Sequence, residues 1–577
     1  MRNNKQIILT ALASVMTFSL LTTFGITEKN SVAKASTTSV ESETEKSAVI
    51  SAGPNIAVVQ TEAGKVQGYS RNGIYTYHGV PYAEAKERFV PAEKVEHWDG
   101  VKLAFNYGPI SPQQQSAGGS DSSWENPSRQ FAMDNNSQNL NIWTPGINDN
   151  AKRPVMVWLH GGGFSTGSSA QTAAYDGANL SQKGDVVVVS VNHRLNVLGH
   201  LDLSQYGEKY KYSENIGITD IVASLKWIRD NITQFGGDPN NITVFGESGG
   251  GAKVLALMTS PYAKGLFQKG IVESGATETM GVNFTSKEAS KRVTELTLQN
   301  LGITADQIEK LQTIPYEELS QASDKALQQT AEELHIPAAL GAGYGLSWEP
   351  VVDGDYMPTS PVTEKGFAEA GKDVPLLIGS NLTEWTDFSP IMNMAKAQSD
   401  NKNTWTEEEI DKHLKETYGD KADEIVNAFL KAYPDKKKAD ALYIDSTTIR
   451  LPLLKIMSHK ADQQGAPVYS YVFSWESPVM NGVFTSYHTS EIPFVFNNID
   501  KADTTIGGGE DAKILEERMS QAWISFARNG KPSADNLPEW EAYDRQGGAT
   551  MIFDNKVKLV HNHDKELMKL LAPNYQY

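Results

Sequence analysis

One stretch of the sequence decides the fold class: Phe235-Gly-Gly-Asp-Pro-Asn-Asn-Ile-Thr-Val-Phe-Gly246-Glu247-Ser248-Gly249-Gly250. Residues 241–245 are typical of a buried strand, and residues 252–259 are typical of the start of a helix. The pattern Gly-x-Ser-x-Gly, centred on Ser248, lies between them. Glycines two residues before and after the serine permit a sharp turn in which a side chain would collide with the neighbouring strand or helix. The stretch therefore predicts a strand, a tight turn that exposes a serine hydroxyl, and a helix.

Similar units lie on both sides of this stretch. Near-continuous apolar runs, typical of strands buried on both faces, occupy residues 154–159 and 185–191. Helical spacing covers residues 220–234, and further strand patterns lie at 266–274 and 374–379. Strands that alternate with helices imply parallel β-α units. We therefore predict an α/β fold with a large central, mostly parallel sheet flanked by helices. Antiparallel strands are expected at 58–69 and 74–80, and helical insertions at 283–340 and 404–460.

Composition excludes several classes of protein. The 577 residues carry a net charge of −18, which argues against a protein that neutralises nucleic-acid phosphates. Hydrophobic residues make up 39% of the chain, enough for a substantial core. The absence of cysteine excludes disulfides, thiol nucleophiles, cysteine zinc sites and a lipidated N-terminal cysteine.

The N-terminal segment predicts export. Arg2 and Lys5 precede a mainly apolar run over residues 7–26, and Ala33-Lys34-Ala35 offers a cleavage site between small residues. We expect a secretory signal peptide at 1–35, a flexible leader rich in Ser, Thr and Glu at 36–53, and a single catalytic domain at 54–577. A secreted chain without cysteine suits a Gram-positive bacterium. The alternative is an uncleaved membrane anchor, since about 20 residues can span a bilayer.

A second glycine-rich segment, His160-Gly161-Gly162-Gly163-Phe164, follows the apolar run 154–159. Consecutive glycines leave backbone N–H groups exposed and able to point at one spot. That is what an oxyanion hole needs, with donors about 2.7–3.1 Å from the developing charge. The alternative interpretation is a simple flexible turn. With the serine turn downstream, we assign Gly161, Gly162 and the residue after the serine, Gly249, as oxyanion donors.

A phosphate-binding loop is a weaker interpretation of the serine turn. Gly246 and Gly251 have the outer spacing of such a loop. However, Ala252 displaces Lys253 by one position, and Val254 lacks the hydroxyl that would hold magnesium.

Taken together, these motifs resemble the type-B carboxylesterases, relatives of the cholinesterases and of bacterial nonspecific esterases. The resemblance runs from about residue 58 to about residue 553 and implies the α/β-hydrolase fold with helical cap insertions. It includes the serine turn, the glycine tract and these further segments: Gly79-Val-Pro-Tyr-Ala83, Trp98-Asp-Gly100, Leu140-Asn-Ile-Trp-Thr-Pro145, Val191-Asn-His-Arg-Leu195 and Trp523-Ile-Ser-Phe-Ala-Arg-Asn-Gly530.

The resemblance implies the partners of Ser248. The family's acid lies in a Gly-x-Asn-x-x-Glu segment, which here ends at Glu384, and its histidine opens a His-x-x-Glu segment, which here begins at His488. A neutral histidine would take the serine proton, and a carboxylate would fix its tautomer. Asp387 competes with Glu384 for the acid role. The other histidines of the family-like stretch lack the His-x-x-Glu setting and are interpreted as core or loop groups: His160, His193 and His200.

Two weaker assignments and several departures follow from the same resemblance. Glu247 matches a position that adds negative potential near the histidine, and Ser274 matches a serine that bonds the acid. Their alternatives are a helix N-terminal charge and a small packing residue. The family usually has alanine where this chain has Gly249. Its Ser-Glu-Asp-Cys-Leu segment is replaced by Asp134-Asn-Asn-Ser137-Gln138.

The sequence therefore predicts a secreted serine carboxylic-ester hydrolase with a Ser-His-Glu triad, acting on a small-molecule ester without cofactor or metal. Turnover should fall below about pH 6.5 as the histidine becomes protonated. A lipase or a feruloyl- or tannin-type esterase remains open, as does, more weakly, a noncatalytic binding protein on this fold. No nucleic-acid partner and no membrane span after signal cleavage are expected. Acyl and alcohol specificity and oligomeric state stay open.

Overall fold

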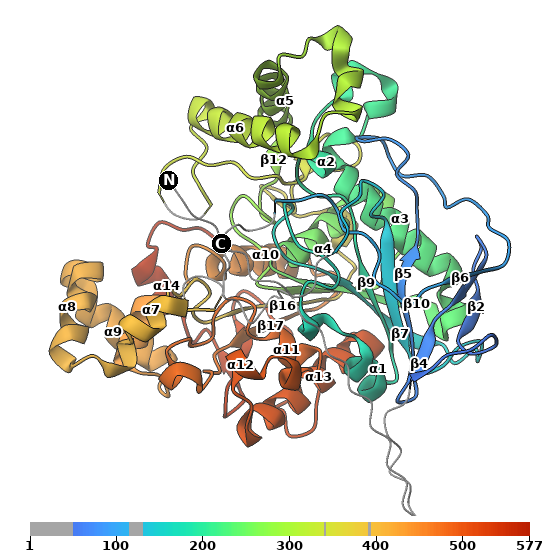
Figure 1. The fold of residues 1–577 in the computed structure, drawn as a ribbon. Helices are drawn as coiled ribbons and strands as arrows, with labels where there is room; N and C mark the ends of the chain where they lie inside the picture. The colour runs from blue at the N-terminus through green and yellow to red at the C-terminus, as the bar shows by residue number, and fades with distance from the viewer. Residues whose placement is uncertain (1–49, 115–130, 340–341, 391–393) are drawn as a thin grey trace, which may run out of the picture. The chain divides into compact units, whose positions relative to one another are not determined.

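A twelve-stranded sheet runs through the part of the chain that the structure describes, residues 50–114, 131–339, 342–390 and 394–577 of a computed structural model (Figure 1). The expected signal peptide and the leader up to residue 49 lie outside the described residues. In spatial order the strands are β1 (Ile50–Ser51), β4 (Tyr69–Arg71), β5 (Ile74–Pro81), β7 (Asn139–Thr144), β9 (Val187–Val191), β8 (Arg153–Leu159), β10 (Gly237–Glu247), β11 (Lys269–Glu273), β16 (Leu376–Asn381), β17 (Val468–Phe473), β18 (Ala549–Phe553) and β19 (Lys558–His561).

The sheet is mixed, which refines the prediction. Neighbours from β9 through β18 pair in parallel, whereas the pairs at both margins are antiparallel. The predicted strand at 58–69 is wrong as one element. Its residues form the antiparallel pair β2 (Val58–Gln60) and β3 (Lys65–Gln67), which joins β6 (Val101–Leu103) in a separate small sheet before β4 begins.

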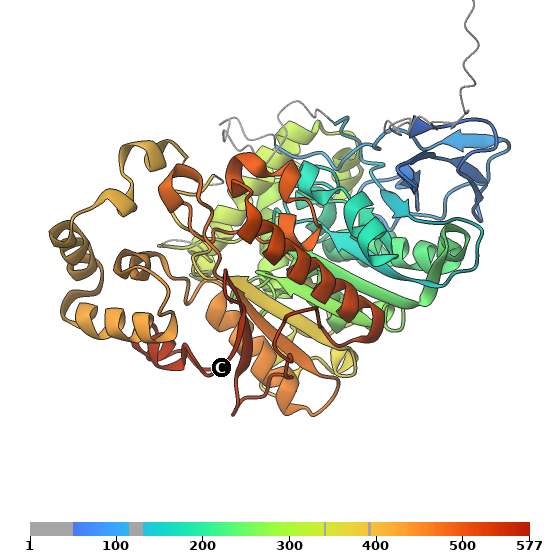
Figure 2. The ribbon, with the colours of Figure 1, turned by 90° about the horizontal axis from the view of Figure 1, so that it is seen from below.

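Successive side chains of the central strands pack on opposite faces of the sheet, as strand geometry requires. In β8, Val157 belongs to a core shared with α3 (Ile216–Asn231), α4 (Gly249–Thr259) and α10 (Arg450–Asp462). Its neighbour Trp158 packs instead with α13 (Glu510–Asn529) and α1 (Ala178–Gly184). The long red helix α13 lies across its face of the strands in Figure 2. The continuous apolar runs therefore mark strands covered on both sides.

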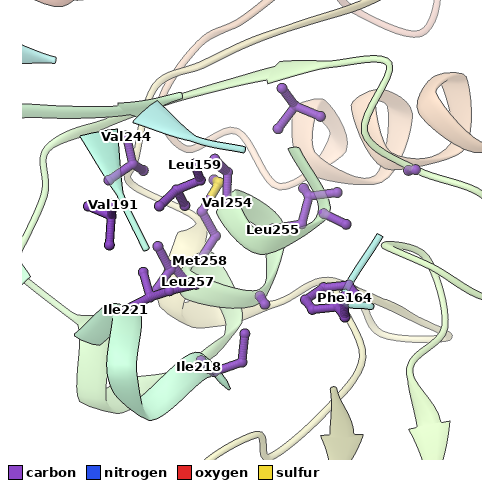
Figure 3. Packing of buried hydrophobic residues seen from close by; sticks show 14 of the residues in the cluster. Leu159, Phe164, Val191, Ile218, Ile221, Val244, Val254, Leu255, Leu257 and Met258 are labelled. Atoms are coloured by element: carbon purple, nitrogen blue, oxygen red, sulfur yellow. The ribbon is translucent and has the colours of Figure 1, made fainter. Parts of the chain in front are cut away.

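Helix α4 begins directly after Ser248 and is buried along its whole length. Figure 3 shows Val254 and Met258 of α4 gathered with Leu159 and Val244 of the strands and with Ile221 of α3. This contact fixes the helix whose first turn forms one side of the serine turn.

The predicted helical insertions are present. α5 (Lys287–Leu301) and α6 (Tyr316–Leu334) occupy the first, and α8 (Glu407–Tyr418), α9 (Ala422–Ala432) and α10 occupy the second (Figure 1). Thr406 and Glu409 form a capping box that starts α8. The remaining elements are α2 (Asn196–His200), α7 (Met394–Ser399), α11 (Ile492–Val495), α12 (Asp503–Ile506), α14 (Lys565–Leu571), β12 (Thr285–Ser286), β13 (Val351–Val352), β14 (Val362–Thr363) and β15 (Gly366–Phe367). Within the described ranges, no helix combines the length and apolar character needed to cross a bilayer.

Candidate active site

The candidate residues follow four neighbouring strands of the parallel centre. The glycine tract comes after β8, Ser248 after β10, Ser274 after β11 and Glu384 after β16. Gly246 is the register partner of Leu159, and Glu247 that of Glu273. Because parallel strands end at one edge of the sheet, the topology brings these segments together although they are far apart in the sequence.

The turn at Ser248 has the strained conformation that the glycine pattern predicts. Ser248 has φ 54° and ψ −127°, a positive φ that non-glycine residues rarely adopt. A Cβ on Gly246 would lie 2.5 Å from the Leu159 carbonyl oxygen, and one on Gly250 only 1.9 Å from it. The requirement for glycine at both positions is confirmed, and its cause is the close approach of β8.

His488 and Glu384 are in direct contact. His488 Nδ1 lies 2.7 Å from Glu384 Oε2. The other carboxyl oxygen, Oε1, accepts hydrogen bonds from Ser274 Oγ and from the Asn381 backbone N–H, each at 2.7 Å. Asp387, the competing acid, instead forms an exposed ion pair with Lys396 at 2.7 Å. The structure therefore brings Glu384, with Ser274 behind it, to the histidine.

Nε2 of His488, the ring nitrogen that does not contact Glu384, faces the turn that carries Ser248. Nε2 has no hydrogen-bond partner among the described residues, and Glu247 Oε1 lies 3.2 Å away. A Cβ on Gly161 would lie 3.1 Å from Glu247 Oε2 and 3.4 Å from Ser248 Cβ. The Glu247 carboxyl group thus lies between His488 Nε2 and the glycine tract. No hydrogen bond between Ser248 Oγ and His488 Nε2 is present in the described structure.

Burial favours the neutral imidazole. It lowers the pKa of His488 to about 4, although the nearby carboxyls of Glu491 and Asp445 oppose this shift. Burial thus opposes protonation of the histidine, so we expect an acid limit lower than the sequence alone indicates. Burial raises the pKa of Glu384, and the hydrogen bonds from Ser274 and Asn381 counteract that rise.

Glu247, beside His488, lies near three further buried carboxyl groups: Glu273, Glu384 and Glu491. Burial raises the pKa of Glu247 well above its ordinary value, and the nearby carboxyls of Glu491, Glu384 and Glu273 raise it further. Glu491 accepts a hydrogen bond from Asn381 Nδ2, and Glu273 accepts one from Trp523 Nε1, both at 2.6 Å. The nearby Lys253 ammonium opposes this rise in the pKa of Glu247.

The glycine tract has free N–H groups. In the described structure, the backbone N–H groups of Gly161 and Gly162 donate no hydrogen bond to protein. Gly249 opens α4, and the N–H of a first helical residue has no carbonyl one turn back. These three groups are the predicted oxyanion donors.

The other histidines of this region lie in the core. His160 and His193 stack with ring centroids 5.1 Å apart, and burial lowers the pKa of both. His200 Nδ1 lies 3.1 Å from the Glu214 carbonyl oxygen. Among the residues that the structure describes, no three His, Asp or Glu side chains gather as metal ligands.

The comparison with family models decides the assignment. The model of the carboxylesterase family matches residues 55–570. This chain belongs to the carboxylesterase family. Among solved structures, an esterase from Clostridium hathewayi that hydrolyses aliphatic aromatic polyesters is 37% identical, with a TM-score of 0.81 over 91% of this chain and 99% of that one. The carboxylesterase is thus a carboxylic ester hydrolase with the family's α/β fold.

Two curated relatives are similar over most of their length. The para-nitrobenzyl esterase of Bacillus subtilis (strain 168) is 35% identical to this carboxylesterase, covering 90% of this chain and 99% of the relative. The phenmedipham hydrolase of Pseudarthrobacter oxydans is 31% identical, covering 86% and 94% respectively.

Two neighbours of the carboxylesterase site were missed by the sequence analysis. The ring of Trp385 lies with its centroid 4.2 Å from that of His488, so it covers one face of the imidazole. Lys253, considered above only as a phosphate ligand, is completely buried and binds the glycine tract. The one signal for Lys253 was a charged residue within an otherwise apolar and small-residue helix.

Proposed function

We propose that this carboxylesterase hydrolyses esters through an acyl-enzyme on Ser248, with His488 as general base and Glu384 as the group that orients it. One observation carries the proposal. The Nδ1 atom of His488 lies 2.7 Å from a carboxyl group that Ser274 and Asn381 hold in place, while Nε2 makes no hydrogen bond among the described residues and lies 3.2 Å from Oε1 of Glu247, the residue before Ser248. This leaves Nε2 as the nitrogen that can receive a proton.

In the proposed reaction, Ser248 Oγ attacks the ester carbonyl carbon while its proton passes to His488 Nε2. The N–H groups of Gly161, Gly162 and Gly249 bind the oxyanion of the tetrahedral intermediate. His488 then gives the proton to the leaving alcohol as the C–O bond breaks. Water repeats the sequence and releases the acid. Glu384 stabilises the imidazolium that forms in each half-reaction, and Ser274 holds Glu384 in place.

Ser248→Ala tests this proposal. With p-nitrophenyl acetate as substrate, we expect turnover to fall by about 10⁴-fold or more, because the nucleophile is lost while the fold is kept. The melting temperature should stay close to that of the wild type. Wild-type protein without ester hydrolysis would favour the noncatalytic alternative, and a variant that hydrolyses as well as wild type would refute the role of Ser248.

A substrate panel separates the activities that share this chemistry. p-Nitrophenyl esters of increasing acyl length distinguish a short-chain esterase from a lipase, and feruloyl and galloyl esters test the aromatic-ester alternative. A p-nitrobenzyl ester belongs in the panel because a relative is named for it. A kcat/KM that rises continuously to long acyl chains would indicate a lipase, and a maximum at short chains would indicate an esterase.

We also propose that the protein is exported and cleaved after Ala35. The positive start, the apolar run and the Ala33-Lys34-Ala35 site support this. N-terminal sequencing of protein recovered from the culture medium should read Ser36 onward. Retention of the full-length chain in the membrane fraction would favour the anchor instead.

A further inference from the structure

Lys253 lies on α4, beyond Ser248 in the sequence, and its side chain is 0% exposed. Its Nζ atom donates hydrogen bonds to the carbonyl oxygens of His160, at 2.9 Å, and of Gly163, at 2.7 Å. Nζ also lies 5.1 Å from the centre of the Phe164 ring. Figure 3 shows Phe164 beside α4. One ammonium group thus binds both ends of the glycine tract, a contact to which the mechanism above gives no role.

These contacts determine where the oxyanion donors point. In a planar trans peptide the C=O and the following N–H point in opposite directions. The Lys253 bond to the His160 carbonyl therefore turns the Gly161 N–H away from α4. His160 Nδ1 lies 2.8 Å from the Gly161 carbonyl oxygen and, facing an acceptor, must carry the proton. That second bond fixes the direction of the Gly162 N–H in the same way.

The residue after the nucleophile is matched to this arrangement. A Cβ on Gly249 would lie 2.2 Å from the Gly163 carbonyl oxygen, the atom to which Lys253 donates. Glycine at position 249 therefore leaves room for the Gly163 carbonyl group that the Lys253 ammonium binds. An alanine at position 249 would collide with this carbonyl group.

We propose that Lys253 is a positioning residue for ester hydrolysis: by holding the His160 carbonyl it aims the Gly161 N–H at the oxyanion, and by holding the Gly163 carbonyl it fixes the far end of the glycine tract. This inference rests on the proposed function. Its ammonium also polarises the His160–Gly161 peptide group, whose N–H end binds the developing charge. Removing the ammonium should thus weaken binding of the transition state more than binding of the ester itself.

The chain offers a matched control. Lys460 on α10 is likewise 0% exposed, and its Nζ donates to the carbonyl oxygens of Gly371, at 2.8 Å, and Lys372, at 2.9 Å. It also lies near an aromatic ring, Phe367, at 5.5 Å. Lys460→Met removes the same kind of interaction from a segment that does not form the glycine tract.

The experiment compares Lys253→Met with Lys460→Met on p-nitrophenyl acetate. Burial lowers the pKa of Lys253 to about 7, with Glu247 opposing, so assays at about pH 6 keep the ammonium form. For Lys253→Met we expect kcat to fall about 10- to 100-fold, with KM within about threefold of the wild-type value. This fall in kcat is smaller than that caused by complete loss of an oxyanion donor. Affinity for a trifluoromethyl ketone, which forms an oxyanion on the enzyme, should fall by the same factor. Lys460→Met should leave kcat within about twofold.

A Lys253→Met enzyme whose kcat falls no further than that of Lys460→Met would overturn the proposal. If Lys253→Met does not fold, Gly249→Ala provides the second variant, because its methyl group must displace the Gly163 carbonyl. A fall in kcat of at least about tenfold is expected there, and unchanged kcat would overturn the proposal. If both variants fold, the double variant should show a smaller effect than the product of the two, since the tract is free to move once the ammonium is gone.

The controls keep this inference separate from the proposed function. Wild-type protein that shows no Ser248-dependent hydrolysis refutes the proposed function. If wild-type hydrolysis depends on Ser248 but the kcat of Lys253→Met equals that of Lys460→Met, only the role of Lys253 is refuted.

Discussion

Replacing Glu384 by glutamine tests how the acid controls His488. The amide has nearly the shape of the carboxyl group, but only one of its two ends accepts hydrogen bonds. The Asn381 N–H, 2.7 Å from Oε1, cannot change from donor to acceptor, so the amide oxygen must occupy that position. The NH₂ group then faces His488 Nδ1, where Oε2 lies at 2.7 Å in the native protein. Nδ1 must become the acceptor, and the ring proton moves to Nε2, which loses the ability to take a proton.

The expected fall in kcat follows from the hydrogen bonds that the Glu384→Gln variant loses. Restoring the productive tautomer requires turning the amide, which sets its NH₂ against the Asn381 N–H at a cost of about 1–3 kcal/mol. Losing the carboxylate beside the imidazolium removes a charge-assisted hydrogen bond, a further ~1.5–3 kcal/mol. The sum, roughly 3–6 kcal/mol, corresponds to a fall in kcat of about 10²- to 10⁴-fold.

The assay is steady-state hydrolysis of p-nitrophenyl acetate, with the melting temperature as the folding control. Asp387→Asn is the matched control, because the exposed Asp387 side chain pairs with Lys396 and not with His488, so the change should leave kcat within about twofold. A folded Glu384→Gln enzyme with kcat within about tenfold of the wild type would refute the orienting role of Glu384.

Three further predictions follow from the structure. Ser274→Ala removes one of the bonds that hold Glu384 as a carboxylate, so kcat should fall about 3- to 10-fold, and unchanged kcat in the same assay would contradict that role. Because burial lowers the pKa of His488 to about 4, the acid limb of kcat/KM should lie below 6.5, and a midpoint at or above 6.5 would contradict that lowered pKa. Asp220→Asn breaks a two-bond ion pair in which the Arg194 side chain is 1% exposed and the Asp220 side chain 0% exposed. The variant should lower the free energy of unfolding in urea by about 3–5 kcal/mol. Glu566→Gln, which breaks an exposed pair, should cost less than about 1 kcal/mol, and equal losses for the two variants would contradict the effect of burial.

The strand, turn and helix around Ser248 could be predicted from the sequence because they depend on local rules. Apolar runs mark the strands, and the glycines at 246 and 250 are required by the close approach of β8, at 2.5 and 1.9 Å from any added Cβ. Parallel β-α units also imply that the segments after the strands meet at one edge. The fold class and the choice of candidate residues followed from these patterns together with the family resemblance.

Other features depend on contacts between distant parts of the chain and could not be predicted. The hairpin β2–β3 leaves the main sheet because it pairs with β6. The pKa of His488 is set by burial that several segments create together. Lys253 meets the His160 carbonyl 93 residues away, and nothing in the local sequence of α4 indicates that partner.

The most direct test of the account is covalent labelling with an organophosphate, followed by mass mapping of the digested protein. Ser248 is the one residue that the account expects to be activated for attack at an electrophilic centre. We therefore expect a single adduct per chain on the peptide that contains Ser248, and none in Ser248→Ala or when His488 is replaced by alanine. An adduct on another peptide, or an unlabelled wild-type protein that still hydrolyses esters, would contradict the account.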